Sequence, residues 1–527
     1  MMRSLYSGVA GLKTHQTKMD VLGNNIANVN TVGFKSSAVN FADTFYQMVS
    51  PATGASPTPG AAGTNAKQIG LGSSVASITT NITEPGGTST TNRALDIAIN
   101  GDAFLIVKQG GSTYFTKSGA MNVDENGTLY CTTNGATVQG WLADADGNVV
   151  KDSVRDLRVM SAENMYYPPT ATGDITMTGN IDKNDKNLVV TGSTKDAAAV
   201  VTDDGHPMTF SFYDELGEMY SVKLFVYSSP SENDAGTDTS AATTAYRVTV
   251  ADVYREDGSS IFVSKSESTD TDSGVTTTSY AATGVKVKLG GVEYEVDGTP
   301  DVNTGKFKLK ADGDRTALLK FVAETGEFSG VVEQGVTRPA TSKYLGKALL
   351  FEVSDAGTLD DTFTNYNETS ETGGVELDFS GLTQYSNGGV ANTSYTWGDA
   401  DGLGAGNSVG QMSGISIDSN GFIYGDYDNG AKKCLGQIAV TTFANPSGLE
   451  AVGDSLFAES LNSGSFDGVG TEVSLSGGFT VGALEMSNVD LASEFTNMIT
   501  TQRGFQANSR IITTSDSMLE ELVNLKR

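Results

Sequence analysis

The sequence is poor in the residues that most often carry out chemistry. Its 527 residues include two histidines, His15 and His206, and two cysteines, Cys131 and Cys434. Acid–base catalysis near neutral pH most often uses histidine. The phosphate-binding and zinc-protease patterns Walker A and HExxH are also missing from the sequence. We therefore predict a protein that is not an enzyme and has no cofactor; a glycosidase built from two surface carboxylates is the enzymatic alternative.

The scarce residues themselves have modest predicted roles. His15 lies within a helical pattern, where packing or helix register is the expected role, and His206 lies in a turn that we expect to be exposed. Two cysteines are too few for a disulfide framework. We expect both to be small buried side chains, with a bridge between Cys131 and Cys434 as the alternative.

Positive charge and long apolar runs are also scarce. Lysine and arginine total 34 against 63 acidic residues, a formal net charge of −29. Nucleic-acid binding needs a basic footprint, so this class is excluded. No apolar run approaches the ~18 residues that span a bilayer, and the first residues lack the pattern of a secretory signal. We expect no membrane insertion and, if the protein is exported, a route other than the general one.

Glycine is abundant and often follows an acidic residue in a short turn. An aspartate that bonds its own backbone, followed by a glycine free to adopt positive φ, is typical of tight hairpins. Calcium binding of the EF-hand type needs a glycine at position six and a glutamate at position twelve, and no turn supplies both. We predict hairpins and no metal site for these segments: 124–127, 144–147, 214–217, 355–357 and 418–421.

Each end of the chain carries apolar residues at a seven-residue period. This period keeps a narrow apolar seam facing a partner helix. We predict that the two terminal helices pair as a coiled coil, are weakly ordered in the monomer and fold when subunits associate; the alternative is that each stripe packs on the protein's own core. The predicted assembly residues are Leu5, Leu12, Met19, Ile26, Leu484, Leu491, Met498, Phe505, Ile512 and Leu519.

Between the ends, short alternating apolar runs separated by turns predict strands. The fold class is therefore α+β, mainly β, with several nested domains. The predicted parts are a terminal helical assembly domain (1–35 and 482–527), an extended arm (36–75), a discontinuous inner β domain (76–160 and 381–481), an outer β domain (161–258 and 341–380) and an inserted variable β domain (259–340).

Several segments also resemble a known family. Residues 5–37 and 502–527 resemble the amino- and carboxy-terminal signatures of the bacterial flagellar axial proteins. Two inner segments resemble segments shared by distal-rod and hook proteins: 92–107 and 114–130. Four others resemble segments typical of hook proteins: 168–182, 210–222, 375–387 and 415–430.

This resemblance implies a structural subunit of the flagellar hook, outside the cell. Its terminal helices would line a curved, flexible tube that passes motor torque to the filament. Implied partners are further copies of the chain, other axial proteins (distal rod, hook–filament junction, hook cap) and the flagellar export apparatus. A distal-rod protein is the alternative within this class, and a secreted β-rich surface adhesin is the alternative from another.

Local signals within the signatures predict helix ends. Gly33 is expected to stop the first helix, and Asp490 is expected to cap the last. Asn24, Asn25 and Asn28 are predicted as capping and inter-subunit contacts, or alternatively as a solvated helix face.

Overall fold

The chain forms two compact units, which are considered separately. The computed structural model describes residues 2–54, 62–144, 147–188, 205–229, 242–269, 276–311, 317–333, 342–355 and 374–525. Unit 1 comprises Met1–Met165, Met412–Tyr427 and Lys432–Arg527, and unit 2 comprises Tyr166–Gln411 and Asp428–Ala431. Residues 356–357 of the predicted turn at 355–357 and residues 145–146 of the turn at 144–147 lie outside the described residues.

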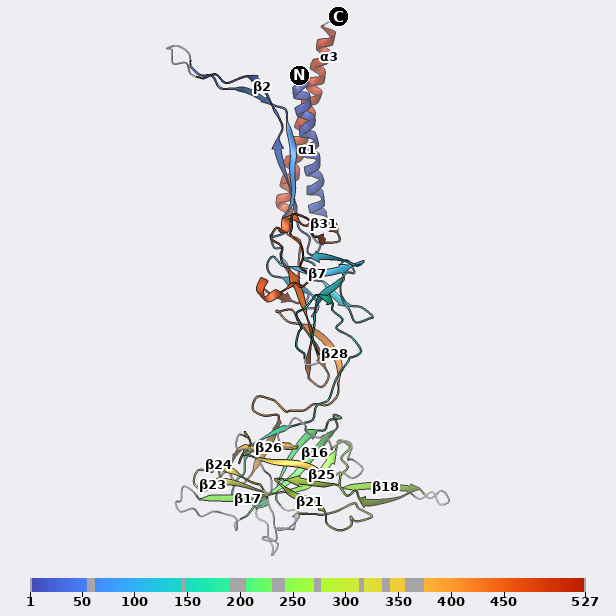
Figure 1. Cartoon of the computed structure of the whole chain (residues 1–527), viewed down its shortest axis with the longest axis vertical. Coiled ribbons are helices and arrows are strands. Elements are labelled where there is room, and N and C mark those ends of the chain that lie inside the picture. Colours follow the sequence, from blue (N-terminus) through green and yellow to red (C-terminus); the bar gives the residue numbers. More distant parts are fainter. Residues whose placement is uncertain are drawn as a thin grey trace. The chain divides into compact units, whose positions relative to one another are not determined.

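Unit 1 contains the two long helices, which run side by side (Figure 1). They are α1 (Met2–Ala27) and α3 (Leu491–Asn524). The predicted cap of α3 is confirmed, because the Asp490 carboxylate accepts a hydrogen bond of 3.0 Å from the Ala492 amide.

The predicted end of α1 at Gly33 is wrong, since the helix already ends at Ala27. The Asn28 side chain donates to the Asn24 carbonyl at 3.0 Å and so satisfies a carbonyl of the last turn. Gly33 instead belongs to the following turn, where its φ is +68° and a Cβ would lie 2.9 Å from the Ser118 nitrogen. Glycine is needed there for both reasons.

An arm of antiparallel strands follows α1 (Figure 1). Strand β1 (Ser37–Asp43) pairs with β4 (Ser73–Thr80), and β2 (Tyr46–Ser50) pairs with β3 (Lys67–Gly70). The arm packs on α1 along β1 and β4, where the Thr14 and Ser73 hydroxyls lie 3.2 Å apart.

The rest of unit 1 is a β domain built from both halves of the chain. In its main sheet the strand order is β28-β29-β30-β11-β7-β8-β32-β31. The bounds are β28 Gly410–Ile417, β29 Phe422–Tyr427, β30 Lys432–Thr441, β11 Thr137–Leu142, β7 Phe104–Gln109, β8 Ser112–Thr116, β32 Leu456–Ala458 and β31 Glu450–Gly453. Shorter elements are β9 Met121–Val123, β10 Leu129–Cys131, β12 Arg155–Asp156, β33 Thr471–Glu472 and the 3₁₀ helices Pro446–Gly448 and Val473–Ser476.

Two small sheets join the start and end of this domain. Strand β34 (Phe479–Val481) pairs with β6 (Ile97–Ile99), and β35 (Ala483–Glu485) pairs with β5 (Thr88–Thr90). Segments nearly 400 residues apart in the sequence are thereby tied together just before α3 begins.

Unit 2 contains two larger sheets. Their orders are β22-β21-β20-β25-β26-β14-β27 and β15-β16-β17-β23-β24. The bounds in the first sheet are β22 Leu309–Ala311, β21 Val292–Val296, β20 Lys286–Leu289, β25 Ala348–Asp355, β26 Val375–Thr383, β14 Asp174–Asn180 and β27 Asn392–Trp397. Those in the second are β15 His206–Tyr213, β16 Met219–Ser228, β17 Thr243–Arg255, β23 Ala317–Val322 and β24 Phe328–Val332.

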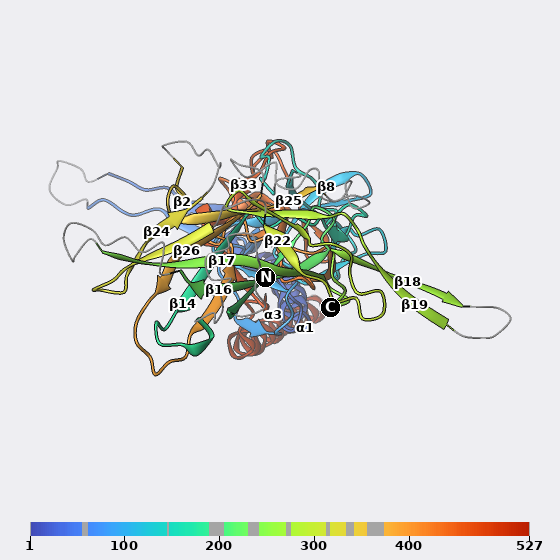
Figure 2. The same ribbon diagram turned by 90° about the horizontal axis from the view of Figure 1, so that it is seen from below.

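The two sheets share one apolar core, to which Phe210 and Tyr246 contribute from the second sheet and Phe351 and Leu377 from the first. Strands β18 (Val263–Thr269) and β19 (Thr276–Ala282) extend from unit 2 as a two-stranded ribbon (Figure 2). β13 (Tyr166–Tyr167) and the 3₁₀ helix Lys186–Leu188 complete the described elements of this unit. Strands within 259–340 pair in both sheets of unit 2, and the boundaries of a separate inserted domain stay a prediction.

The mainly β class with a helix at each end is confirmed. Three of the predicted aspartate–glycine turns join paired strands: 124–127 between β9 and β10, 214–217 between β15 and β16, and 418–421 between β28 and β29.

The predictions for the two cysteines and for His206 had different outcomes. Cys131 is buried and Cys434 is half-buried, and both are free thiols. His206 was expected to be exposed, but its side chain is only 12% exposed because it packs beside Asp185, with 3.6 Å between the Nδ1 and Oδ2 atoms.

Candidate assembly site at the terminal helix pair

The contact between α1 and α3 is lined by small and polar residues. The fully buried positions of the two helices are Gly8, Gly11, Thr14, Leu22 and Asn25 on α1, and Thr501 and Ser515 on α3, and of these Thr14 and Asn25 bond to the arm rather than to α3. Leu22 is the one large apolar side chain among them. The two backbones therefore approach more closely than a leucine seam would allow.

Three glycines mark the closest approaches. A Cβ at Gly8 would lie 3.2 Å from Ile512 Cγ1, and a Cβ at Gly11 would lie 2.6 Å from Asn508 Nδ2. On the other helix, a Cβ at Gly504 would lie 2.7 Å from His15 Cε1. Since positions 8, 11 and 15 meet 512, 508 and 504 in reverse order, the pair is antiparallel.

The residues predicted to form the seams lie mostly at the margins of this contact. Eight of the ten are half-buried: Leu5, Leu12, Met19, Ile26, Met498, Phe505, Ile512 and Leu519. Leu491 is 39% exposed at the first position of α3.

Leu484 is not helical, so its predicted place in the α3 stripe is wrong. It lies in β35, opposite Ser89 of β5. Backbone hydrogen bonds to β5 hold this segment extended, and the helix begins only after the Asp490 cap.

Large apolar side chains also point away from the helix pair. Near the start of α3, Leu491, Phe495 and Ile499 are 39–58% exposed; we call these residues the proximal stripe. Further along, Ile511, Met518, Leu522 and Leu525 are 43–80% exposed and form the distal stripe. Soluble monomers rarely leave such apolar groups uncovered, and larger exposed patches mark interaction sites.

The arm is exposed in a similar way. Phe45 is 87% exposed, and Tyr46, Met48 and Val49 are each more than half exposed. A two-stranded ribbon such as β2–β3 is marginally stable in water by itself. The arm therefore has apolar surface that the described part of this chain does not cover.

A buried ion pair fastens the helices to the β domain of unit 1. Lys35, just beyond α1, lies 2.8 Å from the Glu485 carboxylate in β35, and both side chains are at most 4% exposed. Glu485 also accepts the Gly86 amide at 3.0 Å, and Lys35 donates to the Glu84 carbonyl at 2.7 Å. Charged hydrogen bonds of this kind are strong once the charges are desolvated.

A second lysine lies close to this pair. Lys117 Nζ donates to the Gly101 carbonyl at 2.7 Å and lies 4.9 Å from the centre of the Phe104 ring. Burial lowers the pKa of Lys117 to about 8; the nearby Glu485 carboxylate opposes this shift and Lys35 adds to it.

The predicted asparagine contacts are resolved in part. Asn25 is buried, and its side-chain amide bonds the backbone of Ser37 in both directions at 2.9 and 3.0 Å. It thereby joins α1 to the first residue of the arm. Asn28 donates to Asn24 within the last turn, and Asn24 is exposed.

The small residues of the contact were not predicted from the sequence. The available signal was glycine at positions 8, 11 and 504 inside strongly helical patterns, because glycine in a helix interior is unfavourable and needs a packing reason.

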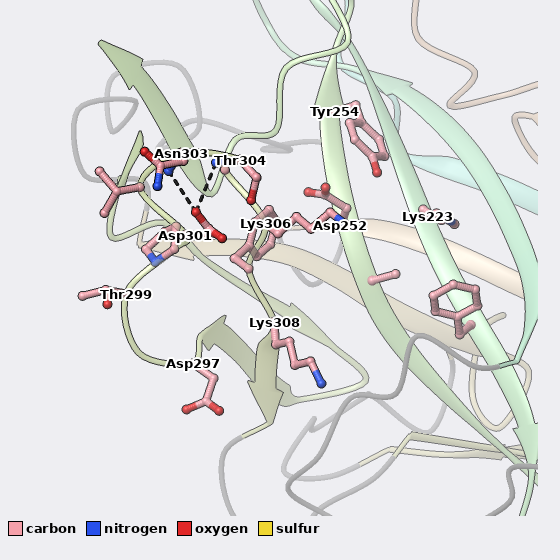
Figure 3. Close-up of a pocket in the computed structure, with 16 residues that line it drawn as sticks. Lys223, Asp252, Tyr254, Asp297, Thr299, Asp301, Asn303, Thr304, Lys306 and Lys308 are labelled. Carbon is pink, nitrogen blue, oxygen red and sulfur yellow. Dashed lines mark hydrogen bonds between the residues drawn. The ribbon is translucent and has the colours of Figure 1, made fainter. Parts of the chain in front are cut away.

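The other surfaces of the described chain give weaker evidence of a functional site than the helix pair does. A cavity of about 1080 Å³ in unit 2 is lined by the 297–308 loop and by strands β16 and β17 (Figure 3). Asp301 in this loop accepts the amides of Asn303 and Thr304 and so organises the turn itself. No histidine or cysteine is among the residues that line it. Within the described ranges, no group of three potential metal ligands comes together, and no described helix is long and apolar enough to cross a membrane.

Three family models match segments of the chain. Residues 5–35 match the flagella basal body rod protein family, residues 480–525 match the flagellar basal body rod FlgEFG protein C-terminal family, and residues 98–183 match the flagellar hook protein FlgE/F/G D1 domain. The first two cover the terminal helices, and the third begins in the β domain of unit 1 and continues into the first strands of unit 2. Together with the paired helices and the β domain, these matches define an axial protein of the bacterial flagellum.

Relatives that match this chain along its whole length show which family within this class it belongs to. The chain is 33% identical to the flagellar hook protein FlgE of Borreliella burgdorferi and 34% identical to that of Treponema pallidum, with all of both chains covered in each case. The basal-body rod protein FlgG of Bacillus subtilis is 37% identical, but it covers only 42% of this chain. The chain therefore belongs to the flagellar hook protein FlgE family.

The protein is a structural subunit of the flagellar hook, an extracellular appendage. The family is a family of structural proteins. Among solved structures, the Helicobacter pylori flagellar hook protein FlgE2 covers 76% of this chain at 11% identity with a TM-score of 0.31, a similarity too low to add to the argument.

Proposed function

We propose that the chain polymerises through its terminal helices into the curved, flexible tube of the hook, which passes motor torque to the filament. The observation that carries this proposal is the uncovered apolar surface of α3. The helix pair covers the Met498 to Leu519 seam, while the proximal and distal stripes are left open for neighbouring copies.

Energetics favour a lattice over a simple dimer. Complete burial of a large apolar side chain contributes ~1.5–3 kcal/mol, so the exposed half of each stripe residue contributes about 1 kcal/mol. Association costs roughly 4–15 kcal/mol in lost freedom of motion. The seven stripe residues come close to that cost without clearly exceeding it. A copy that contacts several neighbours can also bury other exposed apolar groups, such as those of the arm, which favours a tube.

The partners we propose follow from the same surfaces. Further copies of the chain cover the stripes along the tube. At its ends, the distal rod, the hook cap and the hook–filament junction would meet the same terminal helices, and the flagellar export apparatus would deliver the subunit. Support comes from the terminal matches to rod families, since these segments are shared among axial proteins.

The proposal is tested by charging one stripe residue. Ile499→Asp should leave a folded subunit that fails to polymerise, because the charge would have to lose its hydration on assembly. Thr500→Asp is the matched control, since neighbouring helix residues point about 100° apart and Thr500 is exposed. Curved tubes of normal length from the Ile499→Asp variant would contradict the role given to α3.

A charge in the seam tests the pair itself. Ile512→Asp or Phe505→Asp should separate α3 from α1 and also prevent polymerisation.

Electron microscopy of basal bodies from cells lacking the gene gives the complementary result. We expect intact rods without hooks, and missing rods would assign the protein to the rod, the next segment inward, instead of the hook.

A further inference from the structure

We propose that His15 and Gly504 form a steric lock that sets the axial register of α1 against α3. The proposal deepens the proposed function and rests on it only in the last step, where the register decides how the apolar stripes are presented to other copies. The lock concerns two residues at one of the three close approaches of the helices.

The histidine ring occupies the space that any other residue at 504 would need. A Cβ on Gly504 would lie 2.7 Å from His15 Cε1 and 2.8 Å from Nε2. Real Cβ atoms do not approach other heavy atoms so closely, so the ring or the helix must move if a side chain is added.

The imidazole also contacts a second aromatic ring. Phe41 of β1 lies with 5.7 Å between the ring centres and an interplanar angle of 86°. His15 Nδ1 is buried and has no hydrogen-bond partner among the described residues. Packing between α3 and β1 therefore positions this imidazole. Burial and the nearby Lys18 hold its pKa below the usual value, which suits a neutral ring in this site.

The neighbouring contacts toward the start of α1 have the opposite arrangement. At Gly11 and Gly8 the side chains come from α3, where Asn508 and Ile512 lie over the glycines. At Gly504 the side chain comes from α1. Side chains of both helices thus fit glycines of the other, which fixes their alignment along the axis.

Other registers bring side chains together. A shift of one turn along α3 would place Thr501 or Asn508 opposite His15, and each carries a side chain where Gly504 carries none. The lock therefore works by excluding wrong registers as well as by fitting the right one.

Gly504→Ala tests the lock because its expected effect on the helix pair is opposite to its expected effect on α3 alone. Alanine favours helix more than glycine does, so α3 alone would gain stability, whereas the lock predicts that the pair loses its native register. His15→Ala combined with Gly504→Ala should restore it, because the smaller side chain frees the space. Gly23→Ala in α1 is the matched control, since a Cβ there meets nothing within 4 Å.

Register is read directly by disulfide formation in the unpolymerised full-length chain, with Cys434→Ser to remove the half-buried thiol. The reporter pair Gly8→Cys and Ile512→Cys reports the native register, because a Cβ at Gly8 lies 3.2 Å from Ile512 Cγ1. The pairs Gly8→Cys with Asp516→Cys and Gly8→Cys with Ser509→Cys report the two one-turn shifts. We expect Gly504→Ala to slow native cross-linking at least tenfold, and the double variant to recover it.

Native cross-linking at the parent rate in Gly504→Ala would overturn the lock. So would a failure of His15→Ala to rescue Gly504→Ala. A loss and rescue of cross-linking with unchanged tube formation would uphold the lock and contradict the proposed role of the helix pair in assembly. Tube formation that is lost and rescued in step with cross-linking supports both.

Discussion

The sheets of unit 2 and the terminal helix pair of unit 1 are packed by opposite means. In unit 2, Phe210, Phe212 and Phe351 are fully buried, and their rings meet at centre distances of 5.6–6.4 Å. Between α1 and α3, glycine, threonine and serine are buried while phenylalanine and isoleucine remain exposed.

This difference separates two kinds of stability. Buried aromatic side chains stabilise unit 2 within a single chain. The helix pair leaves large apolar side chains of α3 exposed, and isolated helices are marginal in water, so we infer that other copies cover this apolar surface. The β units are complete in the monomer, whereas we infer that the terminal helices are completed in the polymer.

The largest expected effect comes from emptying the unit 2 core. Phe351→Ala removes a fully buried ring and should lower the free energy of unfolding of unit 2 by about 3–5 kcal/mol. Urea denaturation of the monomer measures it. Leu216→Ala, at a residue 59% exposed, is the control. An equal effect of the two substitutions would remove the contrast between the regions.

Breaking the ion pair beside the helices should have an effect of similar size. Glu485→Gln leaves Lys35 buried without a counter-charge, which costs about 3–5 kcal/mol. The double variant Lys35→Met with Glu485→Gln should recover part of this loss, since the unpaired charge is gone but the Gly86 and Glu84 contacts are altered. Denaturation of both variants checks it. A double variant less stable than Glu485→Gln would show that the charge pair is not the source of the loss.

Much of this contrast could be predicted from the sequence. The alternating runs and aspartate–glycine turns correctly predicted strands and hairpins, because both follow from local backbone chemistry. The heptads correctly predicted two long helices. The sequence did not reveal that Gly8, Gly11 and Gly504 would form the contact and displace the apolar columns to its margins, because a helical pattern alone does not say which side of the helix meets its partner.

The prediction for Leu484 was wrong for a different reason. Its spacing matches the α3 stripe, but pairing with β5, nearly 400 residues earlier in the sequence, keeps it extended. Such long-range pairing leaves no trace in a local period. The Lys35–Glu485 pair was missed for the same reason, since 450 residues separate its members.

The pH dependence of stability distinguishes the region around Lys117 and the Lys35–Glu485 pair from the apolar cores. Because the pKa of Lys117 is lowered to about 8 in the folded chain, the folded state binds fewer protons than the unfolded state above pH 8. Stability from this group therefore rises between about pH 8 and its ordinary value of 10.5 and is lost as the pH falls through 8.

Lys117→Met should remove this dependence. Its gain over the parent should be largest below pH 8, about 1–2 kcal/mol after loss of the hydrogen bond to Gly101, and should shrink as the pH approaches 10.5. Thermal unfolding across this range measures the difference. A constant difference at all pH values would mean that Lys117 keeps its ordinary titration when folded.

The smallest effect on the monomer should accompany a clear effect on the polymer. Met518 is 47% exposed in the distal stripe, and its neighbour Leu519 is half-buried in the helix pair. Met518→Ala should change monomer stability by less than about 0.5 kcal/mol. If neighbouring copies cover this side chain, losing about 1.4 kcal/mol of contact would raise the critical concentration for polymerisation roughly tenfold.

Leu519→Ala should instead weaken the helix pair within the monomer. Lower protection of the helices in hydrogen exchange would reveal this effect. Equal behaviour of these two neighbours in both measurements would mean that α3 has no separate inner and outer surfaces, and the contrast with the β units would rest on packing density alone.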